Sequence, residues 1–124
     1  MNINAIIEKV FNNFVFDGKS IPINLSIYKG DATTYLTYYT YSTKPEGFAD
    51  DLPTVEVVYG TMDIYSNQNY KGLKNEVKRK LVQECDFTWL EDGLEDYEED
   101  TELWHIPISF MAESNITFLD DLKN

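Results

Sequence analysis

The chain has 124 residues, and its 22 acidic and 10 basic side chains give a formal net charge of −12. This length predicts one domain with a single hydrophobic core. The negative charge repels phosphate, and it therefore argues against binding to nucleic acid or to an anionic membrane surface.

The first segment of the chain predicts an amphipathic helix. Apolar residues recur at helical spacing from Ile3 to Phe14, and Asp17-Gly18 follows as the stop signal. Glu8 and Lys9 interrupt the segment, so it does not resemble a signal peptide, and no stretch has the roughly 20 apolar residues of a membrane helix. We therefore expect a protein of the cytoplasm or of a particle assembled there.

The next part of the chain predicts three strands. Residues 21–28 alternate apolar and polar side chains, and residues 33–41 are rich in Tyr and Thr, which favour strands. Residues 42–53 contain Lys-Pro-Glu-Gly and Asp-Asp, and they predict a long loop. Residues 54–65 carry apolar side chains in both alternating sets, which is typical of a central strand.

The second half of the chain predicts a helix, two strands and a tail. Residues 70–85 carry an apolar stripe at helical spacing, and residues 87–90 and 103–111 predict strands. Five of the ten bases lie on the predicted helix: Lys71, Lys74, Lys78, Arg79 and Lys80. We expect residues 1–112 to form the domain and residues 113–124 a polar C-terminal tail.

The predicted order of elements is α-β-β-β-α-β-β. Two amphipathic helices need a common apolar surface, and a sheet of about five strands provides one. We therefore expect an α+β fold with a mixed or antiparallel sheet and both helices packed on one of its faces.

The acidic residues are concentrated before the last predicted strand. Residues 91–102 hold eight acids and no base, a charge of −8, whereas the other 112 residues hold 14 acids and 10 bases, a charge of −4. Calcium loops need Gly at the sixth position, but loops that start at Asp92 or Asp96 have Tyr97 or Thr101 there. A solvated loop, an electrostatic contact surface and loose divalent-ion binding stay open.

Catalytic patterns are not found in the sequence. His105 is the only histidine, so no second one shares a metal ion, and no nucleophile-elbow serine is present. Cys85 ends an apolar helical stripe and is expected in the core. Gly18-Lys19-Ser20 lacks the earlier glycine and the strand–loop–helix order of a phosphate-binding loop. We expect no enzyme activity, no cofactor and no metal.

Tyrosine is concentrated in and around the second predicted strand. Five of the nine tyrosines lie within residues 28–41, and the neighbours Tyr38 and Tyr39 must point to opposite faces of a strand. Half-buried sheet positions explain such a set, and so does a protein–protein interface, where tyrosine is enriched. Four tyrosines are therefore candidate subunit contacts: Tyr35, Tyr38, Tyr39 and Tyr41.

Several segments, in this order, resemble a known family. Residues 28–38 read Tyr-Lys-Gly-Asp-Ala-Thr-Thr-Tyr-Leu-Thr-Tyr, residues 57–66 read Val-Val-Tyr-Gly-Thr-Met-Asp-Ile-Tyr-Ser, and residues 97–105 read Tyr-Glu-Glu-Asp-Thr-Glu-Leu-Trp-His. Phe110 follows on the last strand. The set resembles the small tail-completion or tail-terminator proteins, also called head-tail joining proteins, of long-tailed phages of Gram-positive bacteria.

The resemblance implies a virion structural protein without catalytic activity. Such proteins form a ring, commonly of six subunits, at the head-proximal end of the tail, where the ring stops polymerisation of the tube. The implied partners are other copies of the chain, the tail tube protein and a head-completion or connector protein. The implied place of assembly is the cytoplasm of the bacterial host.

Opposite charges indicate one possible subunit contact. Lys71, Lys74 and Lys78 of the predicted basic helix are complementary to the acidic segment, and the two patches would meet across a subunit boundary in a ring. The acids expected at this contact are Glu95, Asp96, Glu98, Glu99 and Asp100. An equal alternative is that the patches are solvated or contact each other within one chain.

Three other functions stay open at this point. An acidic inhibitor that mimics DNA needs carboxylates along an elongated face, but eight of the 22 acids lie in one segment here. A small enzyme needs a closed polar pocket around His105. Another minor component of the head–tail connection would share the size and fold of a tail terminator.

Overall fold

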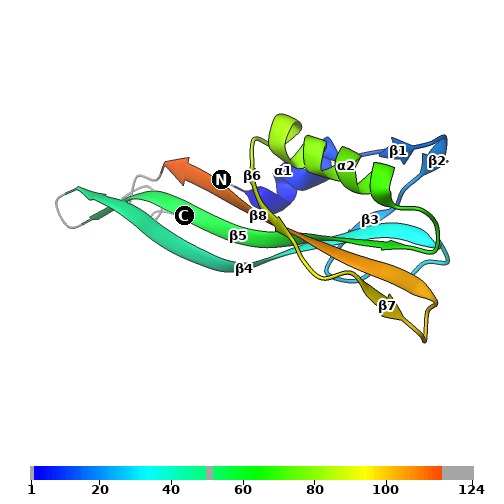
Figure 1. Ribbon diagram of the computed structural model, residues 1–124. Helices are drawn as coiled ribbons and strands as arrows, with labels where there is room; N and C mark the ends of the chain where they lie inside the picture. Colours follow the sequence, from blue (N-terminus) through cyan, green and yellow to red (C-terminus); the bar gives the residue numbers. More distant parts are fainter. Residues whose placement is uncertain (1, 50–51, 116–124) are drawn as a thin grey trace.

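The computed structural model describes residues 2–49 and 52–115 (Figure 1). Its elements in chain order are helix α1 (Ile3–Val10), the short strands β1 (Val15–Phe16), β2 (Lys19–Ser20) and β3 (Ile23–Leu25), the long strands β4 (Thr34–Ala49) and β5 (Leu52–Ser66), helix α2 (Lys71–Arg79) with a following π-helical turn (Lys80–Glu84), and strands β6 (Thr88–Asp92), β7 (Asp96–Glu98) and β8 (Leu103–Asn115).

The main sheet has six strands in the order β3-β4-β5-β8-β6, with β7 also paired to β8. All its pairs are antiparallel except β3 with β4, which is parallel. The predicted α+β fold with a mixed sheet is confirmed, with six strands rather than about five. The prediction of a central strand is also confirmed, because β5 lies between β4 and β8.

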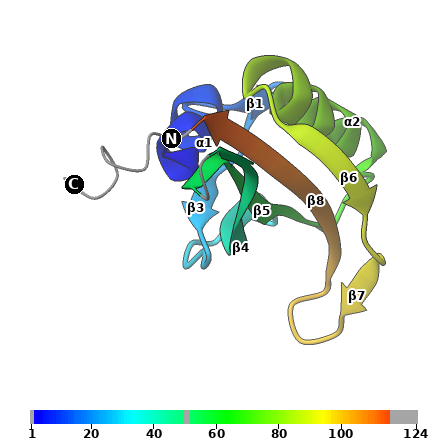
Figure 2. The ribbon, with the colours of Figure 1, turned by 90° about the vertical axis from the view of Figure 1, so that its left-hand side faces the viewer.

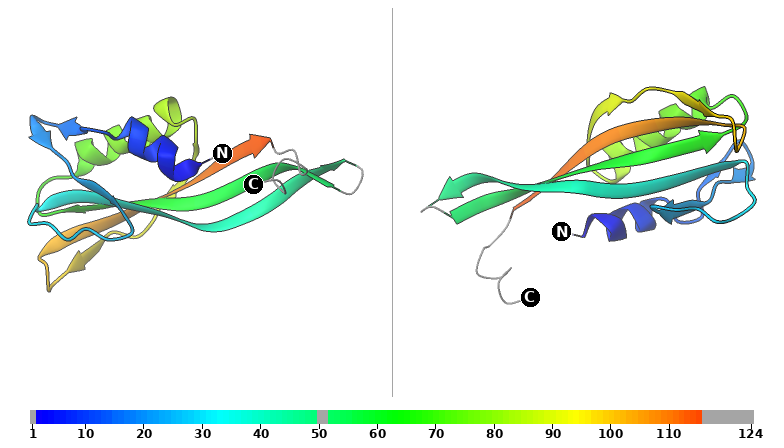
Figure 3. Two further views of the ribbon diagram at one scale, coloured as in Figure 1. Left: turned by 180° about the vertical axis from the view of Figure 1, so that it is seen from behind. Right: turned by 90° about the horizontal axis from the view of Figure 1, so that it is seen from below.

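Both helices lie on the same face of the sheet (Figures 1 and 3). The Asn2 side chain caps α1 by accepting a hydrogen bond from the Ala5 amide, and the Asn69 side chain accepts one from the Lys71 amide at the start of α2. The core lies between this face and the helices. Its members include Ile7, Leu73 and Val77 from the helices and Leu36, Met62, Ile64, Ile106, Ile108 and Phe110 from the strands.

Helix α1 is shorter than predicted, because it ends at Val10 rather than near Asp17-Gly18. Asn13 adopts a φ of +55° and turns the chain back, so that Phe14 still enters the core through an edge-to-face contact with Phe11. Asp17 and Gly18 have φ values of +52° and +75° and form the two-residue turn between β1 and β2. Asp17-Gly18 is therefore a turn, but it connects the two strands of a hairpin and does not end the helix.

The predicted loop at residues 42–53 is wrong for the described residues, because residues 42–49 extend β4 and residues 52–53 begin β5. The strands pair from Ser42 opposite Tyr59 to Ala49 opposite Leu52. Pro45 is compatible with this arrangement because β3 pairs only with the start of β4, so Pro45 lies in an edge strand. We call this extension (residues 42–49 and 52–59) the arm; Figure 3 shows that it reaches beyond the helices.

A β-bulge between Thr40 and Ser42 lies where the arm begins. Gly60 lies opposite Thr40, and a Cβ atom there would be 2.7 Å from the Phe110 ring and 2.8 Å from the Tyr39 carbonyl oxygen. The absence of a side chain at Gly60 therefore allows β4, β5 and β8 to approach closely beside the bulge.

The last strand, β8, extends beyond its predicted end at Met111. Its pairing with β5 continues to Asn115 opposite Val55. The domain boundary expected at residue 112 therefore falls inside a strand, and residues 113–115 of the expected tail belong to β8. Residues 116–124 lie outside the described residues.

Truncating Ile7 tests the packing of α1 on the sheet. Ile7 is fully buried, so Ile7→Ala should lower the free energy of unfolding by about 2–5 kcal/mol through lost burial and a cavity. The measurement is urea denaturation followed by circular dichroism. Ile27 is mostly exposed, and Ile27→Ala is the matched control with a change within about 0.5 kcal/mol. Equal effects of the two variants would contradict the position of α1.

Candidate interaction surfaces

The helix-free face of the sheet carries a row of stacked aromatic rings. Leu36, Ile64 and Ile106 point into the core, so their neighbours in β4, β5 and β8 point to the opposite face. Centroid distances along the row are 4.3 Å from Tyr28 to Tyr35, 4.8 Å from Tyr35 to Tyr65 and 4.5 Å from Tyr65 to His105. We call these four residues the aromatic row.

The strand register explains the aromatic row. Tyr35 lies opposite Tyr65, and Tyr65 lies opposite His105, so the three rings meet across three adjacent strands. His105 therefore has one ring face covered by Tyr65, and its Nε2 atom lies 3.5 Å from a carboxylate oxygen of Asp63. This partly exposed histidine is thus built into the sheet.

Polar side chains beside the aromatic row are also buried. Asp63 and Thr61 are nearly inaccessible, and the Thr61 hydroxyl donates a 2.8 Å hydrogen bond to Asp63. Burial, together with the carboxylates of Asp63 and Glu98, raises the pKa of Tyr65 to about 12. The helix-free face is thus a tightly packed surface of tyrosine and polar side chains.

The four candidate tyrosines occupy different environments. Tyr38 is only 2% exposed beneath α1, and its hydroxyl donates a 2.8 Å hydrogen bond to Glu8, so Tyr38 belongs to the core rather than to a contact surface. Tyr35 is half-buried in the aromatic row. Tyr39 and Tyr41 are exposed and meet edge to face near the start of the arm. The predicted opposite orientation of Tyr38 and Tyr39 is confirmed.

The basic helix contacts the acidic segment within one chain. The ammonium groups of Lys74 and Lys78 lie 3.4 and 3.3 Å from the same carboxylate oxygen of Asp92. Lys78 also lies 4.1 Å from the centre of the Trp89 ring, and the Trp89 indole donates a 3.0 Å hydrogen bond to Asp92. For these two lysines the structure therefore supports the alternative of contacts within one chain.

Two of the three remaining bases of the helix form ion pairs with acids nearby in the sequence, and among the residues that the structure describes Lys71 does not. Arg79 pairs with Glu76 and Glu84, and Lys80 pairs with Glu84. Lys71 is exposed and forms no ion pair within the described residues. Of the three bases proposed for a subunit contact, only Lys71 is thus without an acidic partner in this part of the chain.

The acidic candidates surround the hairpin of β7 and β8, which projects away from the helices (Figure 2). Glu95 accepts a hydrogen bond from the Tyr70 hydroxyl, which raises the pKa of Tyr70 to about 12. Glu98 accepts a 3.1 Å hydrogen bond from Thr101. The other candidates, Asp96, Glu99 and Asp100, are exposed. The predicted acidic loop is therefore partly strand.

An aromatic cluster on this hairpin was not predicted from the sequence. Tyr97 of β7 lies directly opposite Trp104 of β8, with ring centroids 5.2 Å apart, and Tyr70 lies 6.4 Å from Trp104. An interpretation of residues 99–102 as the connection of a hairpin would have placed Tyr97 and Trp104 opposite each other and predicted this contact. The dense acidic residues concealed that pattern, because they indicated a solvated loop.

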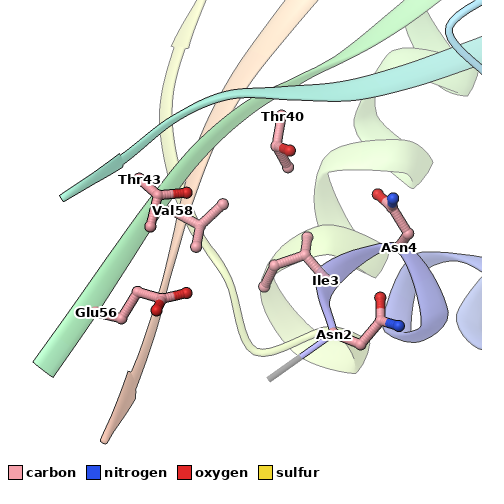
Figure 4. Close-up of a pocket in the computed structure, with 7 residues that line it drawn as sticks. All are labelled: Asn2, Ile3, Asn4, Thr40, Thr43, Glu56 and Val58. Carbon is pink, nitrogen blue, oxygen red and sulfur yellow. The ribbon is translucent and has the colours of Figure 1, made fainter. Parts of the chain in front are cut away.

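An open groove of about 410 Å³ separates the start of α1 from the base of the arm (Figure 4). Its lining residues are Asn2, Ile3 and Asn4 of the α1 region, Thr40 and Thr43 of β4, and Glu56 and Val58 of β5. The Oδ1 atom of Asn4 is buried there without a hydrogen-bond partner. The lining holds one carboxylate and no base, which makes the groove unsuited to an anionic ligand.

Residues 2–49 and 52–115 contain no group of three or more His, Cys, Asp or Glu side chains placed to hold a metal ion. Burial raises the pKa of the Cys85 thiol to about 12, with a contribution from Glu84, so this thiol is unreactive at neutral pH. No helix among the described residues is long and apolar enough to cross a membrane.

No protein-family model matches the sequence, and no curated protein matches it.

Removing the Asp92 charge tests the contact between α2 and β6. Partial burial acts to raise the pKa of Asp92, but the Trp89 hydrogen bond and the two lysines outweigh it and hold this pKa below its usual value. The stabilisation is therefore present above about pH 4 and is lost as the pH falls through the folded-state pKa. Asp92→Asn should cost about 0.5–1 kcal/mol at pH 7 and nothing near pH 2. Urea denaturation at both pH values measures this.

Glu99→Gln is the control for Asp92→Asn, because Glu99 forms no ion pair within the part of the chain that the structure describes. It should leave the stability unchanged at both pH values. A loss for Asp92→Asn that persists at pH 2 would contradict an electrostatic origin.

The raised pKa of Tyr65 predicts a loss of stability in alkali. A phenol that ionises near pH 10 in the unfolded chain and near pH 12 in the folded protein favours folding below pH 10, and this contribution falls between pH 10 and 12. Tyr65→Phe should show a smaller fall over this interval than the wild type. Denaturation midpoints from pH 8 to 12 measure it. The exposed residue Tyr41 provides the control, and Tyr41→Phe should follow the wild type.

Proposed function

We propose that the protein is a virion structural subunit of the tail-terminator or tail-completion type, which assembles into a ring at the head-proximal end of a phage tail. The ring would cap the tail tube and help to join the tail to the head. The motif order in residues 28–38, 57–66 and 97–105 supports this family, and the arm is the structural observation that carries the proposal.

Two strand edges at the arm, one of β4 and one of β8, have no partner in the part of the chain that the structure describes. Within the described residues β4 has no partner on its outer side beyond Tyr38, where the pairing with β3 ends. On the other side of the arm, β6 pairs with β8 only as far as Met111, so Ala112–Asn115 of β8 also have a free edge in this part of the chain. Free edges present unpaired backbone N–H and C=O groups, which favour the addition of another strand.

The two free edges belong to different strands and face opposite directions. The outer edge of β4 in one subunit could therefore pair with the edge of β8 in the next, which is a head-to-tail contact that closes into a ring when the rotation permits. Both strands run antiparallel to β5, so this contact would be parallel, as β3 with β4 already is. Tyr39 and Tyr41 lie exposed beside this edge and would be covered by the contact.

Shortening the arm tests the proposal. Replacing residues 45–56 by Asn-Gly would close the hairpin at Lys44 opposite Val57, and it would retain the fully buried Val57 side chain together with the core beneath the helices. Native mass spectrometry and negative-stain microscopy should find rings for the wild type and folded monomers for the shortened variant. Added to the polymerising tube protein of the same particle, the wild type should limit tube length and the shortened variant should not.

A double variant provides a milder version of this test. Tyr39→Ser with Tyr41→Ser should weaken ring formation, whereas Val82→Ser, at an exposed position on the helical side, should leave it unchanged. Circular dichroism establishes that each variant is folded. A wild-type protein that stays monomeric and leaves tube length unaffected would overturn the proposal.

A further inference from the structure

We infer that the β7–β8 hairpin is a docking site for an arginine-rich segment of a different protein. The site consists of an exposed aromatic cluster, formed by Tyr97 and Trp104 beside Tyr70, and of the carboxylates around it. It lies at the opposite end of β8 from the arm, because Asp96 pairs with His105 whereas Asn115 pairs with Val55. The inference therefore does not depend on ring formation through the arm.

The apolar part of the site is unusually exposed. Tyr97 and Trp104 are 44% and 40% exposed although their rings meet edge to face, and Leu94, in the connection from β6 to β7, is 92% exposed. Aromatic side chains in such positions are typical of the centres of protein interfaces, where Trp and Tyr contribute most of the binding energy. The hairpin thus presents a contact surface that its own domain does not cover.

The charge around this surface determines the kind of partner. Of the eight acids in residues 91–102, only Asp92 has a basic partner among the described residues. The other seven contribute a charge of −7: Glu91, Glu95, Asp96, Glu98, Glu99, Asp100 and Glu102. Complementarity therefore requires a strongly basic partner surface, which steers association and excludes acidic competitors.

A second copy of this chain does not supply such a surface. Asp92 already pairs with Lys74 and Lys78, and Glu76 and Glu84 occupy the next two bases of the helix. Lys71 alone among the bases of the helix has no acidic partner within the described residues, so this helix of a second copy would offer one lysine against seven carboxylates. The partner is therefore a different, basic protein.

The molecule itself displays the chemistry that such a partner would use. Lys78 lies over the Trp89 ring at 4.1 Å and at the same time 3.3 Å from Asp92, so one cation contacts an aromatic face and a carboxylate together. Trp104 and Tyr97 offer the same combination of rings and carboxylates to solvent. Arginine fits it better than lysine, because its planar guanidinium stacks on rings and binds carboxylates with two hydrogen bonds.

Two peptides of equal charge test the inference: nona-arginine and nona-lysine. Tryptophan fluorescence and isothermal titration calorimetry on the full chain should show that nona-arginine binds about 2–5-fold more tightly than nona-lysine at the same ionic strength. Tyr97→Ser should reduce this difference, because it removes one of the two exposed rings and leaves the Coulombic binding in place. Tyr41→Ser, at an exposed tyrosine near the arm, is the matched control and should keep the difference.

Charge reversal tests the acidic part of the site. Glu99→Lys with Asp100→Lys should weaken the binding of both peptides much more than Asp31→Lys with Glu113→Lys, which changes the net charge equally at exposed positions elsewhere. Circular dichroism and urea midpoints establish that the variants are folded.

Several results would overturn the inference. Equal affinity for the two peptides, unchanged by Tyr97→Ser, would mean that carboxylates act without the rings. Equal losses for the two charge-reversed variants would show that net charge alone attracts the peptides. Self-association that depends on Tyr97 would identify a second copy as the occupant. The shortened-arm variant should retain the arginine preference, so a failure of the ring proposal is distinguishable from a failure of this one.

Discussion

The alternation of side chains along β5 is the constraint on which the rest of the structure depends. Met62 and Ile64 point into the core beneath the helices, while Thr61, Asp63 and Tyr65 point to the helix-free face. A shift of one residue in the pairing with β4 or β8 would exchange these two sets. It would move a carboxylate into the apolar core and separate Tyr65 from its stacking partners. The register of β4 and β8 against β5 is therefore fixed, because the apolar side chains of one face and the polar side chains of the other cannot exchange places.

This central strand is longer than the helices that it supports. The helices cover one end of the sheet, and β4 and β5 continue past them as the arm (Figure 3). At the other end, β8 pairs with β7 in the acidic hairpin. One strand order thus produces a packed domain with two projecting regions at opposite ends. The domain is stabilised by its core, which leaves both regions available for contacts with other molecules.

Local patterns predicted most of the fold. Helical spacing identified both helices because each packs one apolar stripe on the sheet, and the double-sided apolar pattern of residues 54–65 identified the central strand. The residues around Pro45 predicted a loop because proline and glycine mark turns, whereas an edge strand tolerates them. The candidate sites were harder to predict. A sequence cannot distinguish Tyr38, which is buried beneath α1, from exposed Tyr39, nor show that Asp92 is the acid that Lys74 and Lys78 contact.

The bulge between Thr40 and Ser42 has a consequence for assembly. One extra residue in β4 bends the strand and increases its twist, and close packing at Gly60 holds that bend in place. The bulge therefore sets the direction in which the arm leaves the domain. In the proposed ring the same angle recurs at every subunit boundary, and the sum of these angles must complete a circle. The geometry of this one inserted residue would then determine the number of subunits in the ring.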